Sequence, residues 1–353
     1  MKNVASREES WSWADFRREI NKPVVRATEA EINDFDDFTD TAALVGDPIL
    51  SIIVRTYRQE DSLGECLESI LRQKTTYQYE IIVSEDGSPD GTLAVAKEYQ
   101  RRYPDRIRLL GARKNHRAAN GRARIERFLR GRYVSWCEGD DHWVDDERIE
   151  RQVSYLESHA ECNFLASRYC VVDAQHRFLY EAPDLSLTQK DITLQHTGYV
   201  FAHLSTWCVR RSFYDRICDL ARKTGVGTDT TLLQIVEGID HAYIMPEVVS
   251  EYHLTGDGVW TSLKNPYRRF ASCIRCRLLR ARHLPEPMSS LNWWDACYQY
   301  YGVIREAVRQ RRLGFAVRAL FACVTTAVCH PRTWIYGFRR IRGKFDKIGA
   351  TKL

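Results

Sequence analysis

Short apolar runs alternate with amphipathic stretches in the first half of the chain. The run from Ile49 to Val54 is almost unbroken, which is typical of a strand buried on both faces of a parallel sheet. The next stretch opens with Ser62-x-x-Glu65, a capping-box pattern, and then repeats apolar residues at helical spacing. This alternation predicts an α/β fold with a Rossmann-like, mostly parallel sheet flanked by helices. The predicted strands are 49–54, 79–83, 107–110 and a run that opens at Tyr133, and the predicted helices are 63–71, 92–101 and 118–129.

The pattern is less regular in the second half of the chain. Extended structure is expected over 241–254, and helices are expected beyond residue 265. The other predicted elements are helices over 147–158 and from about 212, strands over 164–172 and 199–209, and a helix entered through Asp229. We expect an N-terminal extension (1–47), a body with two halves (48–145 and 146–264) and a basic helical C-terminal region (265–353).

Charge is distributed unevenly between the body and the C-terminal region. Residues 268–353 contain 18 Lys or Arg and four acidic residues, a net charge of +14 in a chain whose total is +5. The rest of the chain therefore carries about −9. A basic tail on an acidic body indicates an anionic partner, either nucleic acid or an anionic lipid surface.

Residues 314–329 are apolar but are interrupted by Arg318. The stretch is also shorter than the ~20 residues that a membrane span needs, so we expect either an interfacial helix or a helical hairpin packed on the body. The first 18 residues are polar and charged, with no apolar segment of a signal peptide, which predicts a cytoplasmic protein.

Composition is ordinary for a soluble protein, with 353 residues of which 44% are hydrophobic. The 11 cysteines are scattered through the chain, and we expect reduced, mostly buried thiols. Cys273 and Cys276 form a lone Cys-x-x-Cys without a second pair at zinc-site spacing, so metal or redox chemistry is not expected there.

Three carboxylates follow the strand that opens at Tyr133. Gly139 gives the backbone freedom to turn directly after the strand, which places Glu138, Asp140 and Asp141 at its carboxyl end. Ligands of open α/β sheets bind at that edge, and oxygen donors suit Mg²⁺ or Mn²⁺ bridging to a diphosphate. An acidic turn that caps the following helix would show the same pattern. No Gly-x-Gly-x-x-Gly is present, so a dinucleotide fingerprint is not supported.

Four segments occur in a characteristic order and spacing. They are 49–57, 80–92 with Glu-Asp-Gly-Ser-Pro-Asp-Gly-Thr, 115–131, and 133–143 with Glu-Gly-Asp-Asp. Together they resemble the nucleotide-binding half of family 2 glycosyltransferases, which have a GT-A fold and invert the anomeric centre of the sugar. The resemblance runs from about residue 48 to 261 and is stronger in its first half.

The resemblance implies a nucleotide-binding set of Thr56, Tyr57, Asp86, Arg122 and Asp140. A carboxylate at Asp86 suits the imide N–H of a pyrimidine base. The alternatives are a turn-forming aspartate for Asp86 and a solvated helix face for Arg122.

The resemblance further implies a metal set of Asp140, Asp141 and His253, a catalytic base at Asp229, and a lid with an acceptor-facing aromatic at Trp260. The ion would be Mn²⁺ or Mg²⁺. Asp229 is also in a position to cap its helix, and a lone histidine such as His253 is often structural.

The implied activity is inverting transfer of a sugar from a UDP- or dTDP-sugar to a glycan or lipid-linked acceptor, in the synthesis of cell-surface polysaccharide or lipopolysaccharide. Residues 268–353 would contact the anionic inner leaflet, whereas nucleic acid is a less favoured partner. Nucleotidyl transfer is disfavoured because Arg55–Arg58 lacks the glycine-rich loop of that class. A non-catalytic scaffold with a basic membrane- or nucleic-acid-binding tail is the alternative reading.

Overall fold

The computed structural model describes residues 11–24, 28–116, 118–188, 202–224, 241–254, 265–286, 288–332 and 334. The chain packs as two compact units. The sheet unit consists of Arg26–Asp219 and Ile235–Thr255, and the helical unit consists of Met1–Val25, Leu220–Gln234 and Gly256–Leu353.

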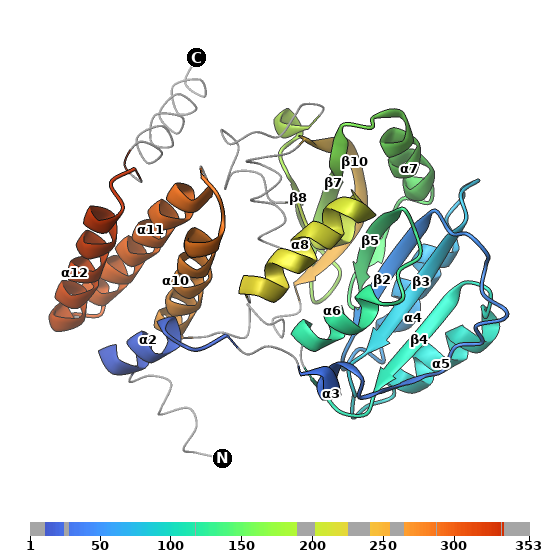
Figure 1. Cartoon of the computed structure of the whole chain (residues 1–353), viewed down its shortest axis with the longest axis horizontal. Helices are drawn as coiled ribbons and strands as arrows, with labels where there is room; N and C mark the ends of the chain where they lie inside the picture. The colour runs from blue at the N-terminus through green and yellow to red at the C-terminus, as the bar shows by residue number, and fades with distance from the viewer. Residues whose placement is uncertain are drawn as a thin grey trace. The chain divides into compact units, whose positions relative to one another are not determined.

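A ten-stranded sheet forms the centre of the sheet unit (Figure 1). Its strand order is β1-β4-β3-β2-β5-β9-β7-β10-β6, and β8 pairs with β7. Strands β4, β3, β2 and β5 are mutually parallel, and so are β7 and β10, whereas the remaining pairs are antiparallel. The predicted mostly parallel α/β sheet is therefore confirmed. The strands are β1 Phe35–Asp37, β2 Leu50–Thr56, β3 Tyr79–Glu85, β4 Ile107–Ala112, β5 Tyr133–Glu138, β6 His142–Trp143, β7 Cys162–Asp173, β8 Phe178–Ala182, β9 Cys208–Arg210 and β10 His241–Leu254.

Helices cover both faces of this sheet. Apolar side chains of α4, α5 and α7 join one face of β2, β3 and β4 in a single buried cluster. The opposite face meets α6 and α8, which lie in front in Figure 1, and there Trp136 packs on Tyr214 with ring centroids 5.2 Å apart. The helices of the sheet unit are α3 Glu29–Ile32, α4 Leu63–Leu71, α5 Thr92–Arg102, α6 Ala118–Glu126 and α7 Arg148–Ser158, with 3-10 turns η1 Leu185–Leu187 and η3 Leu204–Thr206. Helix α8 Arg211–Thr224 begins in the sheet unit, and its residues from Leu220 onward belong to the helical unit.

Two local predictions are wrong for identifiable reasons. Ser62 precedes α4 but makes no capping bond, because its hydroxyl donates to the carbonyl of Gly139 at 2.8 Å. The predicted strand over 199–209 is a strand only from Cys208 in its described part, because His203 accepts a bond from Ser205 N–H and starts the turn η3.

The helical unit unites the two ends of the chain. The N-terminal extension contains helix α2, and its Phe16 is fully buried among aromatic and aliphatic side chains of the C-terminal helices. Two arginines fix α2 through main-chain oxygens: Arg275 donates to Lys22 and Pro23, and Arg312 donates to Trp11. The helices are α2 Trp13–Ile20, α10 Pro266–His283, α11 Met288–Arg309 and α12 Leu313–Cys329.

All 11 cysteines are free thiols, as expected. Within the described residues no helix is both long enough and apolar enough to cross a membrane.

The amino ends of β2, β3 and β5 are joined around a buried carboxylate. Glu80 is fully buried, accepts from Ser51 Oγ at 2.6 Å and pairs with Arg130 at 2.7 Å. Gly131 packs directly on β2 at this junction, since a Cβ on Gly131 would lie 2.5 Å from the Ser51 nitrogen and 2.7 Å from the Leu50 carbonyl carbon. The close approach of two main chains therefore requires glycine here.

Replacing Gly131 by alanine is predicted to destabilise the protein. The added methyl group meets main-chain atoms that cannot rotate away, and overpacking of this kind costs about 1–3 kcal/mol. The matched control is Gly46→Ala, where no atom lies within 4 Å of the added Cβ. Chemical denaturation of both variants measures the difference, and equal stability of the two would contradict the described junction.

Candidate active site

The carboxyl ends of three parallel strands meet at one edge of the sheet. Register pairs Thr56 of β2 with Glu85 of β3, and Arg55 of β2 with Glu138 of β5. The residues that follow these strand ends therefore lie at a common edge, as expected for ligand binding in an open α/β sheet.

Asp86 lies at this edge beside the end of β2. Its main-chain N–H donates to Thr56 O at 3.1 Å, and its Oδ1 accepts the N–H of His116 at 3.3 Å. The turn that follows is held by the neighbouring carboxylate, because Glu85 accepts from the N–H groups of Gly87 and Ser88. The side chain of Glu85, rather than that of Asp86, therefore stabilises this turn.

Thr56 and Tyr57 differ in their exposure. Thr56 is 3% exposed, and its hydroxyl oxygen has no hydrogen-bond partner in the described part of the chain. Tyr57 is 37% exposed, and the Arg58 guanidinium lies 5.6 Å from the centre of its ring. A buried hydroxyl without a partner beside an exposed aromatic ring leaves polar and stacking contacts open to a ligand.

Asp141 is the most deeply buried carboxylate of the cluster. It is 2% exposed, its Oδ2 accepts a hydrogen bond from Ser205 Oγ, and His203 Nδ1 lies 3.6 Å from the same oxygen. Its Oδ1 is buried without a hydrogen-bond partner among the described residues. The pKa of Asp141 is raised well above its ordinary value. Burial is the largest cause, and the charge of Asp140 is the second.

Asp140 stands beside this carboxylate in a less isolated environment. Burial raises the pKa of Asp140 above its ordinary value. The charges of His253 and Arg55 and a hydrogen bond with the Gln59 side chain act in the opposite direction. Two adjacent carboxyl groups with raised pKa values and one orphan oxygen fit a bound divalent cation, which would neutralise both. The residues present therefore suit Mn²⁺ or Mg²⁺.

Arg148 supports the turn that carries Ser205. This arginine is 1% exposed, and it donates to the carbonyl oxygens of Ser205 and Trp207 and to Ser135 Oγ. Its guanidinium also lies 3.9 Å from the Trp143 ring centre, and burial lowers the pKa of Arg148 to about 9. The sequence patterns did not indicate Ser205, His203 or Arg148, because each acts through contacts distant in sequence.

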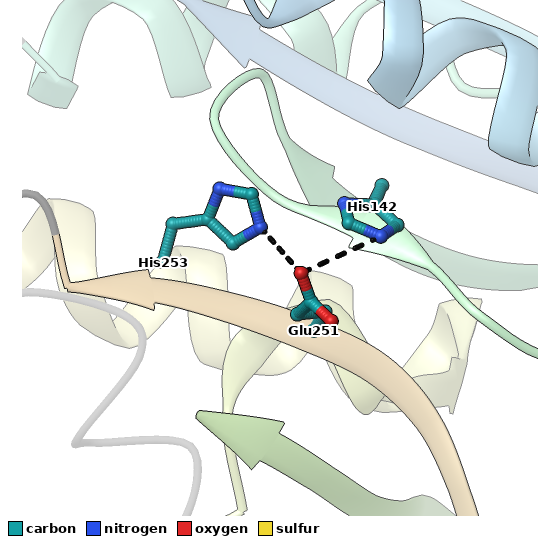
Figure 2. Close-up of side chains that lie close together, drawn as sticks. All are labelled: His142, Glu251 and His253. Atoms are coloured by element: carbon teal, nitrogen blue, oxygen red, sulfur yellow. Dashed lines mark hydrogen bonds and ion pairs between the residues drawn. The ribbon is translucent and has the colours of Figure 1, made fainter. Parts of the chain in front are cut away.

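His253 contacts a different group of side chains. Its Nε2 lies 2.8 Å from Glu251 Oε1, and His142 Nε2 lies 3.8 Å from the same oxygen (Figure 2). His142 and Glu251 were not among the predicted residues. The sequence signals for this group were the resemblance that implied His253 as a metal ligand and the nearness of His142 to the acidic motif.

The two arginines of α6 occupy different surroundings. Arg122 pairs with Glu126 one helical turn later, with 3.1 Å between Nε and Oε1. Arg124 is fully buried, and among the charges acting on it is that of Asp86. Arg124 is therefore an α6 residue whose charge acts on the predicted base-binding carboxylate. The predicted base Asp229 and lid residue Trp260 lie outside the described residues.

Comparison with known proteins adds a family match. Residues 51–217 match the family described as Glycosyl transferase family 2, so this part of the chain carries a domain of that family. The chain is 34% identical over 224 residues to the uncharacterized protein Rv1520 of Mycobacterium tuberculosis, covering 63% of each chain. It is 26% identical to TuaG of Bacillus subtilis, named for teichuronic acid biosynthesis, covering 66% of this chain and 92% of TuaG. The chain thus spans somewhat less than two thirds of the mycobacterial relative.

Solved structures share the fold. TarS 1–349 of S. aureus in complex with UDP-GlcNAc superposes with a TM-score of 0.57 at 14% identity, over 83% of this chain and 88% of TarS. The mannosyltransferase PcManGT of Pyrobaculum calidifontis, in complex with GDP-Man and Mn²⁺, gives a TM-score of 0.50 at 15% identity, over 94% of this chain and 92% of that one. The predicted GT-A type of sheet is therefore confirmed at the level of fold.

Replacing Asp141 by asparagine is predicted to stabilise the metal-free protein at neutral pH. Because its pKa is raised in the folded state, the stability of the protein falls as the pH rises above the unfolded value near 3.8, so this ionisable carboxyl group opposes folding at pH 7. Replacing it by a neutral amide should raise the free energy of unfolding by about 1 kcal/mol or more in EDTA, with the gain shrinking toward pH 4.

The control is Asp146→Asn, since Asp146 is 38% exposed and its pair with Arg72 is a surface ion pair. Its substitution should change stability by less than about 1 kcal/mol. An Asp141→Asn variant less stable than the parent in EDTA would show that the described neighbours already compensate the buried charge.

Proposed function

We propose that the chain transfers a sugar from a UDP- or dTDP-sugar to a hydroxyl group of a glycan or lipid-linked acceptor, with inversion and with the help of Mn²⁺ or Mg²⁺. The observation that supports this most directly is the Asp140–Asp141 pair, with its unpartnered buried oxygen, at the carboxyl edge of a family 2 glycosyltransferase sheet. The name of a similar protein is consistent with a UDP-sugar donor. WfgD of Escherichia coli, 29% identical over 110 residues, is named as a glucosyltransferase that uses UDP-Glc.

The donor would occupy the edge formed by β2, β3 and β5. Tyr57 would stack on the base, Asp86 would accept its imide N–H, and the Thr56 hydroxyl would gain its missing partner. Asp140 and Asp141 would hold the cation, which as a Lewis acid offsets the charge that builds on the departing diphosphate. Arg122, which pairs with Glu126, would reach the phosphates only after breaking that pair.

Transfer also needs a base for the acceptor. The acceptor oxygen forms a bond to the anomeric carbon as the bond from that carbon to the diphosphate oxygen breaks, and Asp229 would take the hydroxyl proton. Trp260 would face the acceptor sugar. Cell-surface polysaccharide synthesis is the process we assign, in keeping with the name of TuaG.

Donor binding is predicted to require both the cation and Asp141. Calorimetric titration of the full chain with UDP, dTDP and GDP, each with and without Mn²⁺, should show Mn²⁺-dependent binding of UDP or dTDP. Asp141→Ala should abolish it, because the cation loses its most buried ligand. Asp229→Asn should retain donor binding and lower kcat about 10²- to 10⁴-fold.

The nucleotide that binds, or the absence of binding, distinguishes glycosyl transfer from a non-catalytic role. Preference for GDP would overturn the base assignment at Asp86 and retain glycosyl transfer. Absence of binding for all three nucleotides would favour a non-catalytic scaffold.

The helical unit would attach the enzyme to an anionic membrane surface, at the inner face of the cytoplasmic membrane. Helix α12 buries one face but exposes a second apolar face. Exposed arginines, including Arg311, Arg318 and Arg332, accompany this face and suit anionic headgroups. The exposed apolar residues of α12 are Leu313 (66%), Val317 (66%), Leu320 (52%), Phe321 (75%), Val324 (51%) and Val328 (70%).

Removing apolar area from this face is predicted to weaken vesicle binding. Phe321→Ser combined with Val328→Ser should reduce partitioning to vesicles of phosphatidylcholine with phosphatidylglycerol at least about tenfold, since burying one such side chain is worth about 1.5–3 kcal/mol. The control is Thr325→Ser, an exposed polar position of the same helix. Unchanged partitioning of the double variant, or preference for DNA over vesicles with steep salt dependence, would refute membrane attachment.

A further inference from the structure

Three metal-ligating side chains gather on one face of the sheet beyond the carboxylate pair (Figure 2). Strand register explains their meeting: Glu251 of β10 pairs with His142 of β6, and His253 lies two residues further along β10. Side chains two apart on a strand share a face, and directly paired residues do so as well. The three ligand atoms all lie within 4.8 Å of one another.

The distances suit a shared cation. Glu251 Oε1 lies 2.8 Å from His253 Nε2 and 3.8 Å from His142 Nε2. Ligand atoms of a tetrahedral zinc site with bonds of about 2.1 Å are about 3.4 Å apart, a value between these two distances. The side chains are 11% to 19% exposed, so the group is shielded but remains reachable from solvent.

A fourth potential ligand comes from the turn between β7 and β8. His176 Nδ1 lies 3.8 Å from the same Glu251 oxygen, and its ring meets that of His253 edge to face at 4.7 Å. His176 has φ of 58°, a left-handed conformation that is costly for a residue other than glycine.

The donor set differs in kind from the candidate donor-sugar site. Two imidazoles and a carboxylate favour Zn²⁺ and related transition metals, whereas Asp140 and Asp141 offer only oxygens. Alternation along β10 directs the side chains of Glu251 and His253 away from Tyr252, which packs on His203 with ring centres 4.3 Å apart, although His253 is near enough to Asp140 for its charge to act on that carboxylate. His203 in turn lies beside Asp141.

We propose that His142, Glu251 and His253 bind a Zn²⁺-class cation, separate from the cation at Asp140 and Asp141. The ion fastens β6 to β10 immediately after Asp141 in the chain, and His176 completes its coordination. It is a structural site that positions the acidic motif. The proposal does not depend on glycosyl transfer, because it rests only on the described histidines and glutamate.

The test is direct metal binding by the full chain after removal of divalent ions with EDTA. Calorimetric titration with Zn²⁺ and the visible absorption of bound Co²⁺ should both report about one equivalent per chain. His142→Gln combined with His253→Gln should weaken Zn²⁺ binding more than about tenfold and remove the tetrahedral Co²⁺ spectrum. The Zn²⁺-induced rise in unfolding temperature should disappear as well.

Controls separate this site from others. His159→Gln removes a histidine that stacks on Tyr155 away from the group and should bind Zn²⁺ like the parent. Asp140→Asn combined with Asp141→Asn should lose Mn²⁺-dependent nucleotide binding and keep Zn²⁺ binding, so failure of the donor proposal is distinguishable. Should the double histidine variant not fold, Glu251→Gln is measured instead. Zn²⁺ affinity and Co²⁺ spectra unchanged in these variants would overturn the proposal.

Discussion

The sheet unit is organised around a carboxylate that has been removed from water. Asp141 is 2% exposed beside a second acidic residue, and a charge in that position is costly unless an opposite charge joins it. Its surroundings hold it in place without neutralising it: Ser205 donates one hydrogen bond, and Arg148 holds the turn behind Ser205. The described neighbours thus leave the charge of an ionised Asp141 without compensation, and a bound cation would supply the missing positive charge.

The N-terminal extension is shared between the two units: Phe35–Asp37 adds strand β1 to the sheet, whereas helix α2 packs with the C-terminal helices. Helix α2 packs into the aromatic centre of the helical unit, where Trp13 and Phe16 both meet Phe315. Part of the positive charge of the C-terminal region is structural, because Arg275 and Arg312 bind main-chain oxygens near α2. Net charge alone therefore overstates the basic surface that is free for a partner.

Much of the sheet was predictable because its apolar sequence runs coincide with strands that are buried in the fold. The apolar runs that predicted β2, β3 and β4 are the strands buried on both faces, and the turn after β5 places the acidic motif at the sheet edge. The approach to β9 was not predictable, because the turn at Ser205 is fixed by Arg148 from a different helix. The edge strand β1 was also missed, since Phe35-Asp36-Asp37 is too short and acidic to carry a strand signal.

The candidate site was predictable where it follows strand ends, at Thr56, Asp86, Asp140 and Asp141. Its other members meet only through sheet register. His142 and Glu251 are more than 100 positions apart in the chain. The sequence around neither residue predicts that β6 pairs with β10. The roles of Asp229 and Trp260 come from family resemblance alone.

The two-residue length of β6 has a consequence for how this loop changes in evolution. Asp141 directly precedes β6 and His142 begins it, and the two side chains lie in different surroundings, Asp141 beside Ser205 and His142 beside Glu251. Inserting or deleting one residue between Asp140 and Trp143 would exchange these environments even if every side chain were retained. Variation among relatives in this loop should therefore take the form of substitutions at constant length.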